Sequence, residues 1–306
     1  MKTSYTERLY LRKTVLPAQD GVRLDRFLRQ WGIPGSFVSH CKFIENGLQI
    51  NDRPARTDAV LQVGDCVSLR IDDVGQTNRA HPMDCGVQIV WEDEYLAVFR
   101  KPAGLAVHGS ERLNIPTVAS FAAFCWGAGT AFHPVNRLDR GTSGLMLVAR
   151  CGFIHDCLRR QLHSPELRRE YLAICDGVPA IRRGIWNDPI GEDPSRKNCR
   201  ILRADGKTAV TAYEVLSENG CQSLLRLRLE TGRCHQIRVH CAAHGLPLCG
   251  DVVYGGSELL SRPALHSAEL RFLHPVTGET LCFTDPLPAD MHTLAEHLCV
   301  SRYLSP

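Results

Sequence analysis

The chain has no apolar run that approaches the roughly 18 uninterrupted residues a membrane-spanning helix requires. Its first residues, MKTSYTERLYLRK, also lack the apolar core of a secretory signal peptide. We therefore expect a cytoplasmic protein that has no membrane partner.

The sequence also lacks the cysteine patterns of disulfide frameworks and zinc sites. Its 14 cysteines are scattered along 306 residues, and no two form a CxxC pair. The closest group of possible ligands contains Cys234, His235, His240, Cys241 and His244, without the spacing of a zinc site. A P-loop and a dinucleotide fingerprint are missing too. We expect reduced cysteines, no bound metal and no cofactor.

Neither sign of charge is in large excess. The net charge is +3, and 44% apolar with 23% charged residues is the composition of a globular protein long enough for two domains. Arginine is nevertheless concentrated locally, and its guanidinium suits bidentate phosphate contact, so nucleic acid is a candidate ligand. The clusters are Arg23, Arg26 and Arg29; Arg137 and Arg140; Arg159 and Arg160; Arg168 and Arg169; and Arg226, Arg228, Arg233 and Arg238.

The first 75 residues contain a small basic unit. In VRLDRFLRQWGIP, residues 22–34, apolar side chains recur at helical spacing and arginines occupy the other face. A second helix is expected from about Ser36 to Asn46, ended by Gly47. Residues 48–56 alternate around an Asn-Asp turn, and residues 61–71 enter a strand after a Gly-Asp turn. The pattern predicts an α/β-hairpin domain over residues 1–75.

A second, larger domain is expected over residues 88–306, after a polar, Gly- and Pro-containing linker at 76–87. Residues 87–104 predict a hairpin around 92–94, and further strands are expected at 144–150, 169–177, 207–216 and 223–230. Helices are expected at about 116–126, 152–162, 234–244 and 290–299. This order predicts an α+β fold, a mixed and mainly antiparallel sheet with flanking helices.

Five motif stretches lie at the ends of these strands. They are RKPAGLAVHG, HPVNRLDRGTSGLMLVAR, LRREYLAICDG, LETGRCHQIRVHCAAHGLPLCGDVVYGG and LHSAELRFLHPVTG. Within the second, Asp139 is flanked by two arginines and precedes a Thr-Ser-Gly turn. Taken alone, such an aspartate is usually a salt-bridged turn residue, so its neighbourhood decides its role.

In this order and at these separations, the five stretches resemble the RluA family of pseudouridine synthases. These enzymes detach uracil from its ribose within RNA, rotate it and rejoin it through carbon. The most specific match pairs RLDRGTSG with TGRCHQIRVH downstream. The N-terminal pattern resembles the alpha-L RNA-binding module of a ribosomal small-subunit protein and several RNA enzymes. Together the resemblance covers roughly residues 20 to 285.

The resemblance implies three catalytic residues. Asp139 would be the catalytic carboxylate, Tyr171 the aromatic partner of the flipped base, and Arg238 the arginine that pairs with Asp139. An adjacent guanidinium favours the ionised carboxylate, which is then available as nucleophile or base. Whether Asp139 attacks the sugar, attacks the base or removes a sugar proton stays open, and Asp251 is a possible supporting group. Tyr171 as a strand tyrosine and Arg238 as a surface arginine are the structural alternatives.

Several basic residues would contact RNA. Arg137 would fill the space left by the extruded base, while Lys101, with Pro102 and His108, would shape the pocket wall. The structural alternative for each is a solvated or packed side chain, and His235 and Gln236 are expected to cap and pack a helix. The full set of proposed RNA contacts is Lys101, Arg137, Arg140 and Arg233 near the site and Arg23, Arg26, Lys42 and Arg53 in the N-terminal module.

Three residues depart from the family pattern. Asn136 stands where histidine is usual, Arg169 where lysine is usual, and Cys234 where threonine is usual. None removes a proposed catalytic group, but the motifs do not choose the substrate.

The sequence thus predicts a monomeric, cofactor-free pseudouridine synthase that acts on structured RNA. Large-subunit ribosomal RNA is the favoured substrate and tRNA the alternative. A non-catalytic RNA-binding assembly factor on the same scaffold would keep its function without the charge of Asp139. A nucleoside hydrolase would release free uracil.

Overall fold

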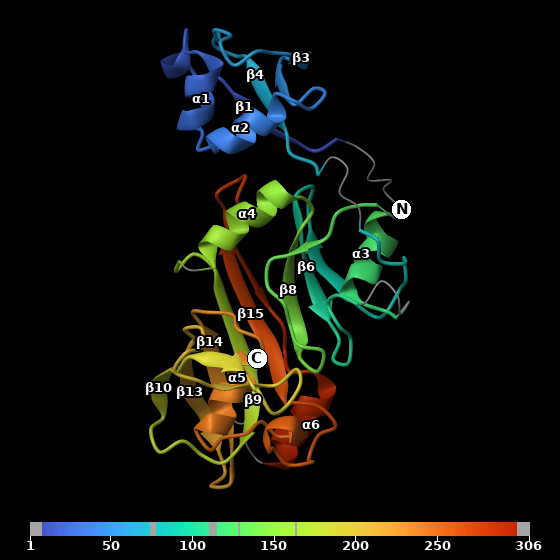
Figure 1. Ribbon diagram of the computed structural model, residues 1–306, viewed down its shortest axis with the longest axis vertical. Coiled ribbons are helices and arrows are strands. Elements are labelled where there is room, and N and C mark those ends of the chain that lie inside the picture. The colour runs from blue at the N-terminus through green and yellow to red at the C-terminus, as the bar shows by residue number, and fades with distance from the viewer. Residues whose placement is uncertain (1–7, 74–77, 110–114, 128, 163, 299–306) are drawn as a thin grey trace.

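The strands of the computed structural model form two main sheets (Figure 1), and the structure describes residues 8–73, 78–109, 115–127, 129–162 and 164–298. The N-terminal sheet has the order β1-β4-β2-β3. Its strands are β1 (Tyr10–Thr14), β2 (Leu48–Ile50), β3 (Arg53–Pro54) and β4 (Cys66–Arg70), and a 3-10 turn, η1 (Pro17–Gln19), follows β1.

The two helices of the N-terminal unit follow the predicted pattern with one correction. In α1 (Leu24–Gln30), Leu24, Phe27 and Leu28 are buried, as their spacing predicted. The second helix, α2 (Gly35–Cys41), ends five residues before the expected Asn46. The chain turns there because Asn46 has a left-handed backbone, and a Cβ on Gly47 would lie 2.0 Å from the Cys41 carbonyl oxygen.

The hairpin between β2 and β3 is confirmed at the predicted turn. Asn51 and Asp52 both have positive φ, 51° and 60°, which is the requirement of the two-residue turn that matches strand twist. Strand β4 follows the Gly64 turn as expected. Strand β1 was not predicted, and it pairs along its whole length with β4.

The larger sheet has ten strands in the order β10-β13-β14-β9-β15-β8-β6-β5, with β7 added on β8 and β16 on β15. Among the pairings between the named strands of the described residues, only β15 with β8 is parallel, so the predicted mixed, mainly antiparallel sheet is confirmed. Its strands are β5 (Gln88–Glu92), β6 (Leu96–Lys101), β7 (His133–Pro134), β8 (Ser143–Ala149), β9 (Arg168–Asp176), β10 (Arg183–Asn187), β13 (Val210–Glu218), β14 (Gln222–Leu229), β15 (Leu265–Leu273) and β16 (Thr280–Thr284). Strands β11 (Ile190–Glu192) and β12 (Arg200–Leu202) form a separate pair.

The helices of this part lie close to their predicted positions. They are α3 (Val118–Trp126), α4 (Gly152–Gln161), α5 (Gln236–Ala243) and α6 (Ala289–His297), with a short 3-10 turn, η2 (Val252–Tyr254). Residue 299, the last of the expected C-terminal helix, lies outside the described residues. No helix in the described part of the chain is long and apolar enough to span a membrane.

The N-terminal unit packs against the larger part beside α4 (Figure 1). The ring centroids of Phe37 and Phe153 are 4.5 Å apart, and the Tyr95 hydroxyl donates to the Tyr10 carbonyl at 3.1 Å. One apolar cluster contains buried residues from both parts. The predicted boundary at residues 75 and 76 falls outside the described residues, and the domain limits stay a prediction.

Three adjacent strands create the site region. Tyr171 of β9 lies opposite Ser267 of β15, and Ser267 in turn lies opposite Gly144 of β8. The parallel pairing of β15 with β8 therefore places the start of β8, and the turn before it, next to Tyr171.

Candidate active site

The turn that holds Asp139 connects β7 to β8. The backbone N–H of Thr142 donates to the Asp139 carbonyl at 3.0 Å, and the Ser143 hydroxyl lies 2.9 Å from His266 Nδ1. Gly144 has φ of +108°, and a Cβ there would lie 2.3 Å from the Ser267 carbonyl oxygen. The Thr-Ser-Gly sequence thus closes the turn, anchors it on β15 and permits the close approach of the two strands.

Arg238 connects Asp139 to a second carboxylate. Its Nε donates to Asp251 Oδ2 at 2.6 Å and its Nη2 to Oδ1 at 2.8 Å, while Nη1 lies 3.6 Å from Asp139 Oδ2. Burial opposes the charge of Arg238, but the hydrogen bonds and charge of Asp251 outweigh it and raise the pKa of the guanidinium. The predicted pair of Arg238 with Asp139 is present as a longer contact, and Asp251 is the stronger partner.

Tyr171 is the third of the predicted catalytic residues. It is 4% exposed, and burial raises the pKa of its phenol. Together with Asp139 and Arg238 it lines a cavity of about 50 Å³, which is small beside the roughly 300–1,000 Å³ of typical ligand pockets. The other lining residues are Arg137, Leu138, Thr142, Leu229, Arg233, His235, Gln236, Ile237 and Leu265.

The predicted RNA contacts near the cavity differ in accessibility. Arg137 and Arg140 are exposed, and the Arg140 Nε donates to the Gly104 carbonyl at 2.9 Å. Arg233 is half-buried, lines the cavity and donates to the Thr208 carbonyl at 2.8 Å. These three positions are compatible with RNA contact.

Lys101 requires a correction. Its side chain is 0% exposed, and its ammonium donates to the carbonyls of Pro102, Leu105 and Arg140 at 2.9, 2.9 and 3.3 Å. Burial lowers its pKa to about 8. A buried ammonium that serves three backbone acceptors cannot reach an RNA phosphate. Lys101 instead ties its own loop to the turn that carries Asp139.

The remaining predicted wall residues also lie elsewhere. Neither Pro102 nor His108 lines the Asp139 cavity; Pro102 lines a separate pocket, and exposed His108 packs edge-on against Phe132. The loop after Lys101 is hydrogen-bonded to the turn that carries Asp139, from Gly104 to the Arg140 carbonyl at 2.8 Å, but these two side chains do not reach the cavity.

Two of the departures from the family pattern are buried. Asn136 is 4% exposed, and its Oδ1 accepts a hydrogen bond from the Leu147 backbone at 2.7 Å. Arg169 is 5% exposed and donates to the Leu229 carbonyl at 3.4 Å. Both residues therefore act as internal supports of the sheet rather than as surface contacts.

The packing role expected of Gln236 is confirmed. Its Oε1 accepts from the Thr231 hydroxyl and the Arg233 backbone, while its Nε2 donates to the Val210 carbonyl and the Thr211 hydroxyl. This network fixes the start of α5 and therefore the position of Arg238 two residues later.

A cluster that spacing did not predict lies beside the catalytic candidates. One donor atom each from Asp139, Cys234 and His235 lies within 4.8 Å of the others. His235 precedes α5 with a left-handed φ of 56°, and its Nδ1 is 2.8 Å from the Tyr254 hydroxyl. Asp139 comes from a distant part of the sequence, so only the fold brings the three together.

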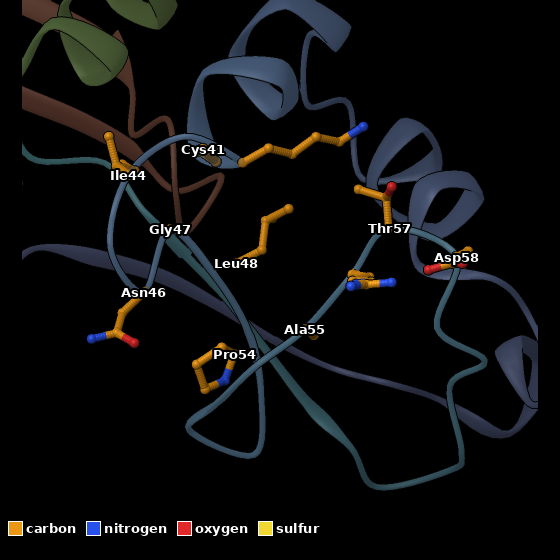
Figure 2. A pocket seen from close by; sticks show the side chains of 11 residues that line it. Cys41, Ile44, Asn46, Gly47, Leu48, Pro54, Ala55, Thr57 and Asp58 are labelled. Atoms are coloured by element: carbon orange, nitrogen blue, oxygen red, sulfur yellow. The ribbon is translucent and has the colours of Figure 1, made fainter.

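The four predicted contacts of the N-terminal module, Arg23, Arg26, Lys42 and Arg53, are all exposed. Lys42 lines a groove of about 480 Å³ between the end of α2 and the segment from Pro54 to Asp58. Figure 2 shows Leu48 in the middle of the lining side chains, with Asn46 on one side and Thr57 on the other. Arg56 also lines this groove and is a second cation there, although it was not among the predicted RNA contacts.

The comparisons with known proteins agree with this arrangement. A family model described as RNA pseudouridylate synthase matches residues 95–243. A Bacillus subtilis (strain 168) protein named uncharacterized RNA pseudouridine synthase YhcT is 36% identical over 253 residues, 81% of this chain and 83% of that protein. A Xanthomonas campestris pv. campestris protein named ribosomal large subunit pseudouridine synthase D is 33% identical over 308 residues, 94% of this chain and 92% of that protein.

A solved structure is also similar. Human RNA pseudouridylate synthase domain containing 4 superimposes with a TM-score of 0.56 and 25% identity, over 69% of this chain and 92% of that one. Four of the five motif stretches contribute residues to one cavity, and relatives above 30% identity align along most of their length. This chain therefore belongs to the RluA-type RNA pseudouridine synthases, isomerases that act on RNA.

Proposed function

We propose that this synthase modifies uridines of large-subunit ribosomal RNA and that Asp139 is its catalytic carboxylate. The observation that carries the catalytic part is the arrangement of Asp139, Arg238 and Tyr171 around one cavity, with Arg238 held by Asp251. A rigidly held cation beside a carboxylate orients that carboxylate toward the cavity.

The chemistry requires one such carboxylate. The reaction breaks the C–N bond between uracil N1 and ribose and forms a C–C bond from the same ribose carbon to uracil C5. The hydrogen on C5 leaves as a proton, and N1 takes up a proton, so the product is an isomer of the substrate. Electrons balance without an external oxidant or reductant. Ordinary glycosidases flank the bond with two carboxylates. Here Asp251 is 1% exposed and bound to Arg238, so Asp139 is the carboxylate available to substrate.

A uridine must leave its stack to reach Asp139, at a cost of a few kcal/mol. The cavity of about 50 Å³ is too small for a pyrimidine, so a lining side chain moves when the base enters. Arg137 is exposed at the cavity and suited to take the place of the extruded base in the RNA. Tyr171, fixed on β9, offers its ring as a stacking partner.

The assignment of large-subunit ribosomal RNA as the substrate is supported by other observations than the cavity. Relatives from Xanthomonas campestris and Zymomonas mobilis, 33% and 35% identical, bear the name ribosomal large subunit pseudouridine synthase D. The exposed arginines and lysine of the N-terminal module suit a large, structured polyanion. Transfer RNA is the second candidate.

Site mapping decides between them. Unmodified transcripts of large-subunit rRNA, small-subunit rRNA and tRNA are incubated with the enzyme, and carbodiimide adducts of pseudouridine are then located by primer extension. We expect new stops on large-subunit rRNA alone. Stops on tRNA but not on rRNA would overturn the rRNA assignment and leave the catalytic assignment intact.

A further inference from the structure

We propose that Asp139, Cys234 and His235 form an inhibitory binding site for a thiophilic divalent cation such as Zn²⁺. The three side chains offer a carboxylate oxygen, a sulfur and an imidazole nitrogen, all within 4.8 Å of one another. Zinc binds sulfur, nitrogen and carboxylate donors of this kind, whereas Mg²⁺ and Ca²⁺ bind oxygen ligands. The inhibitory effect, though not the binding, rests on the proposed role of Asp139.

The distances between the three donor atoms allow all three to coordinate one ion. Zinc bonds of about 2.0 to 2.3 Å in a tetrahedron place neighbouring donors about 3.3 to 3.8 Å apart. The three donors therefore need to approach one another by about 1.5 Å at most. Cys234 is exposed and its side chain is short, so rotation about its Cα–Cβ bond brings the sulfur closer to the other two donors without disturbing the core.

His235 has a supporting partner of the kind metal-binding histidines use. Its Nδ1 lies 2.8 Å from the Tyr254 hydroxyl, which also accepts the Arg200 backbone N–H at 2.9 Å. With its hydrogen on Nδ1, His235 donates to Tyr254 and leaves the Nε2 lone pair for a cation. Such a second contact fixes the tautomer and the ring direction.

The neighbouring arginine does not cancel the negative charge that attracts the cation. Arg238 makes two short hydrogen bonds to Asp251, so those two charges compensate each other. Its remaining contact with Asp139 is 3.6 Å long. Asp139 and a Cys234 thiolate then supply two negative charges to a divalent ion, and solvent completes the coordination. An ion held there occupies the carboxylate that the reaction needs.

Cobalt binding provides a readout that does not depend on activity. Metal-free wild-type protein, Cys234→Ser and Cys221→Ser are titrated with Co²⁺ under reducing conditions, and the near-ultraviolet thiolate-to-cobalt band is followed. Cys221 is also exposed and serves as the matched control. We expect a saturable band in wild type and Cys221→Ser and its loss in Cys234→Ser. A band that persists in Cys234→Ser, or none in wild type, would overturn the site.

Inhibition is measured in parallel. Zn²⁺ should inhibit pseudouridine formation by wild type and Cys221→Ser, reversibly with chelator, and Cys234→Ser should need at least about ten-fold more zinc. Equal sensitivity of all three proteins would overturn the inhibitory role. If the wild-type protein forms no pseudouridine even when no metal is added, the proposed function is contradicted instead. The cobalt band still tests the metal site in that case.

Discussion

The guanidinium of Arg238 is bound to Asp251 through two hydrogen bonds of 2.6 and 2.8 Å. Arg238 comes from α5 and lines the cavity, and Asp251 comes from the segment just before η2, so the pair joins these two elements. Because both partners are buried, the contact fixes the direction in which the remaining nitrogen of Arg238 faces Asp139.

Asp251→Asn should therefore reduce catalysis although Asp251 does not touch the cavity. The neutral amide holds Arg238 less firmly, and misplacement of a catalytic neighbour by about 1 Å lowers the rate on the order of 10²-fold. We expect this loss in kcat, with RNA affinity nearly unchanged. Asp205→Asn, which weakens the exposed pair of Asp205 with Arg203, is the control. A change confined to KM would show that Asp251 serves binding instead.

Gly144→Ala should destabilise the fold. The methyl group would meet the Ser267 carbonyl oxygen at 2.3 Å, and φ of +108° is unfavourable for alanine. We expect the free energy of unfolding to fall by at least about 3 kcal/mol in urea denaturation. The control is Gly35→Ala, at a helical glycine with nothing within 4 Å of the added carbon. Wild-type stability of Gly144→Ala would contradict the close approach of β8 and β15.

Local patterns predicted a large part of this fold. The buried face of α1 and the Asn51-Asp52 turn follow from side-chain spacing and backbone preference within a few residues. Strand β15 was missed because its buried first half carries His266 and Ser267, polar side chains that satisfy their hydrogen bonds inside the sheet. Periodicity of apolar residues does not detect such a strand.

The candidate site was likewise predicted only in part from the sequence. The motifs identified Asp139, Tyr171 and Arg238, which the fold places around one cavity. They did not reveal that Asp251 is the stronger partner of Arg238 or that Lys101 is buried, because both depend on contacts between distant segments. A lysine at the end of a strand carries no local sign of burial.

The N-terminal module should contribute to the salt dependence of RNA binding. Replacing Arg23, Arg26 and Arg53 by glutamine removes up to three phosphate contacts, so the slope of log K against log salt should fall by roughly 2 to 3. Binding is measured on one RNA at several salt concentrations. Substitution is cleaner than deletion of the module, because its core is shared with the larger part.

Two arginines outside the module provide the comparison for that experiment. Arg183→Gln and Arg203→Gln remove surface cations that pair with Glu214 and Asp205. These variants should keep the wild-type slope. If the triple variant keeps it as well, the module is not an RNA anchor.

Lys101 should make stability depend on alkaline pH. Burial lowers its pKa from 10.5 to about 8, so between those values the unfolded chain binds more protons and folding becomes more favourable as pH rises. Relative to Lys101→Met, wild type should gain up to about 3 kcal/mol from pH 7 to pH 11. Exposed Lys207→Met controls for the loss of a surface charge. Parallel curves for wild type and Lys101→Met would contradict the burial of a charged ammonium.

The most direct test of catalysis by Asp139 follows the hydrogen that the reaction releases. RNA labelled with tritium at uracil C5 loses that label to water when C5 bonds to ribose, so release measures turnover. Wild type should release tritium stoichiometrically with modified sites, and Asp139→Asn, nearly isosteric, should release none while binding the RNA within a few-fold of wild type. Tritium release by Asp139→Asn at an appreciable fraction of the wild-type rate would contradict the role of this carboxylate.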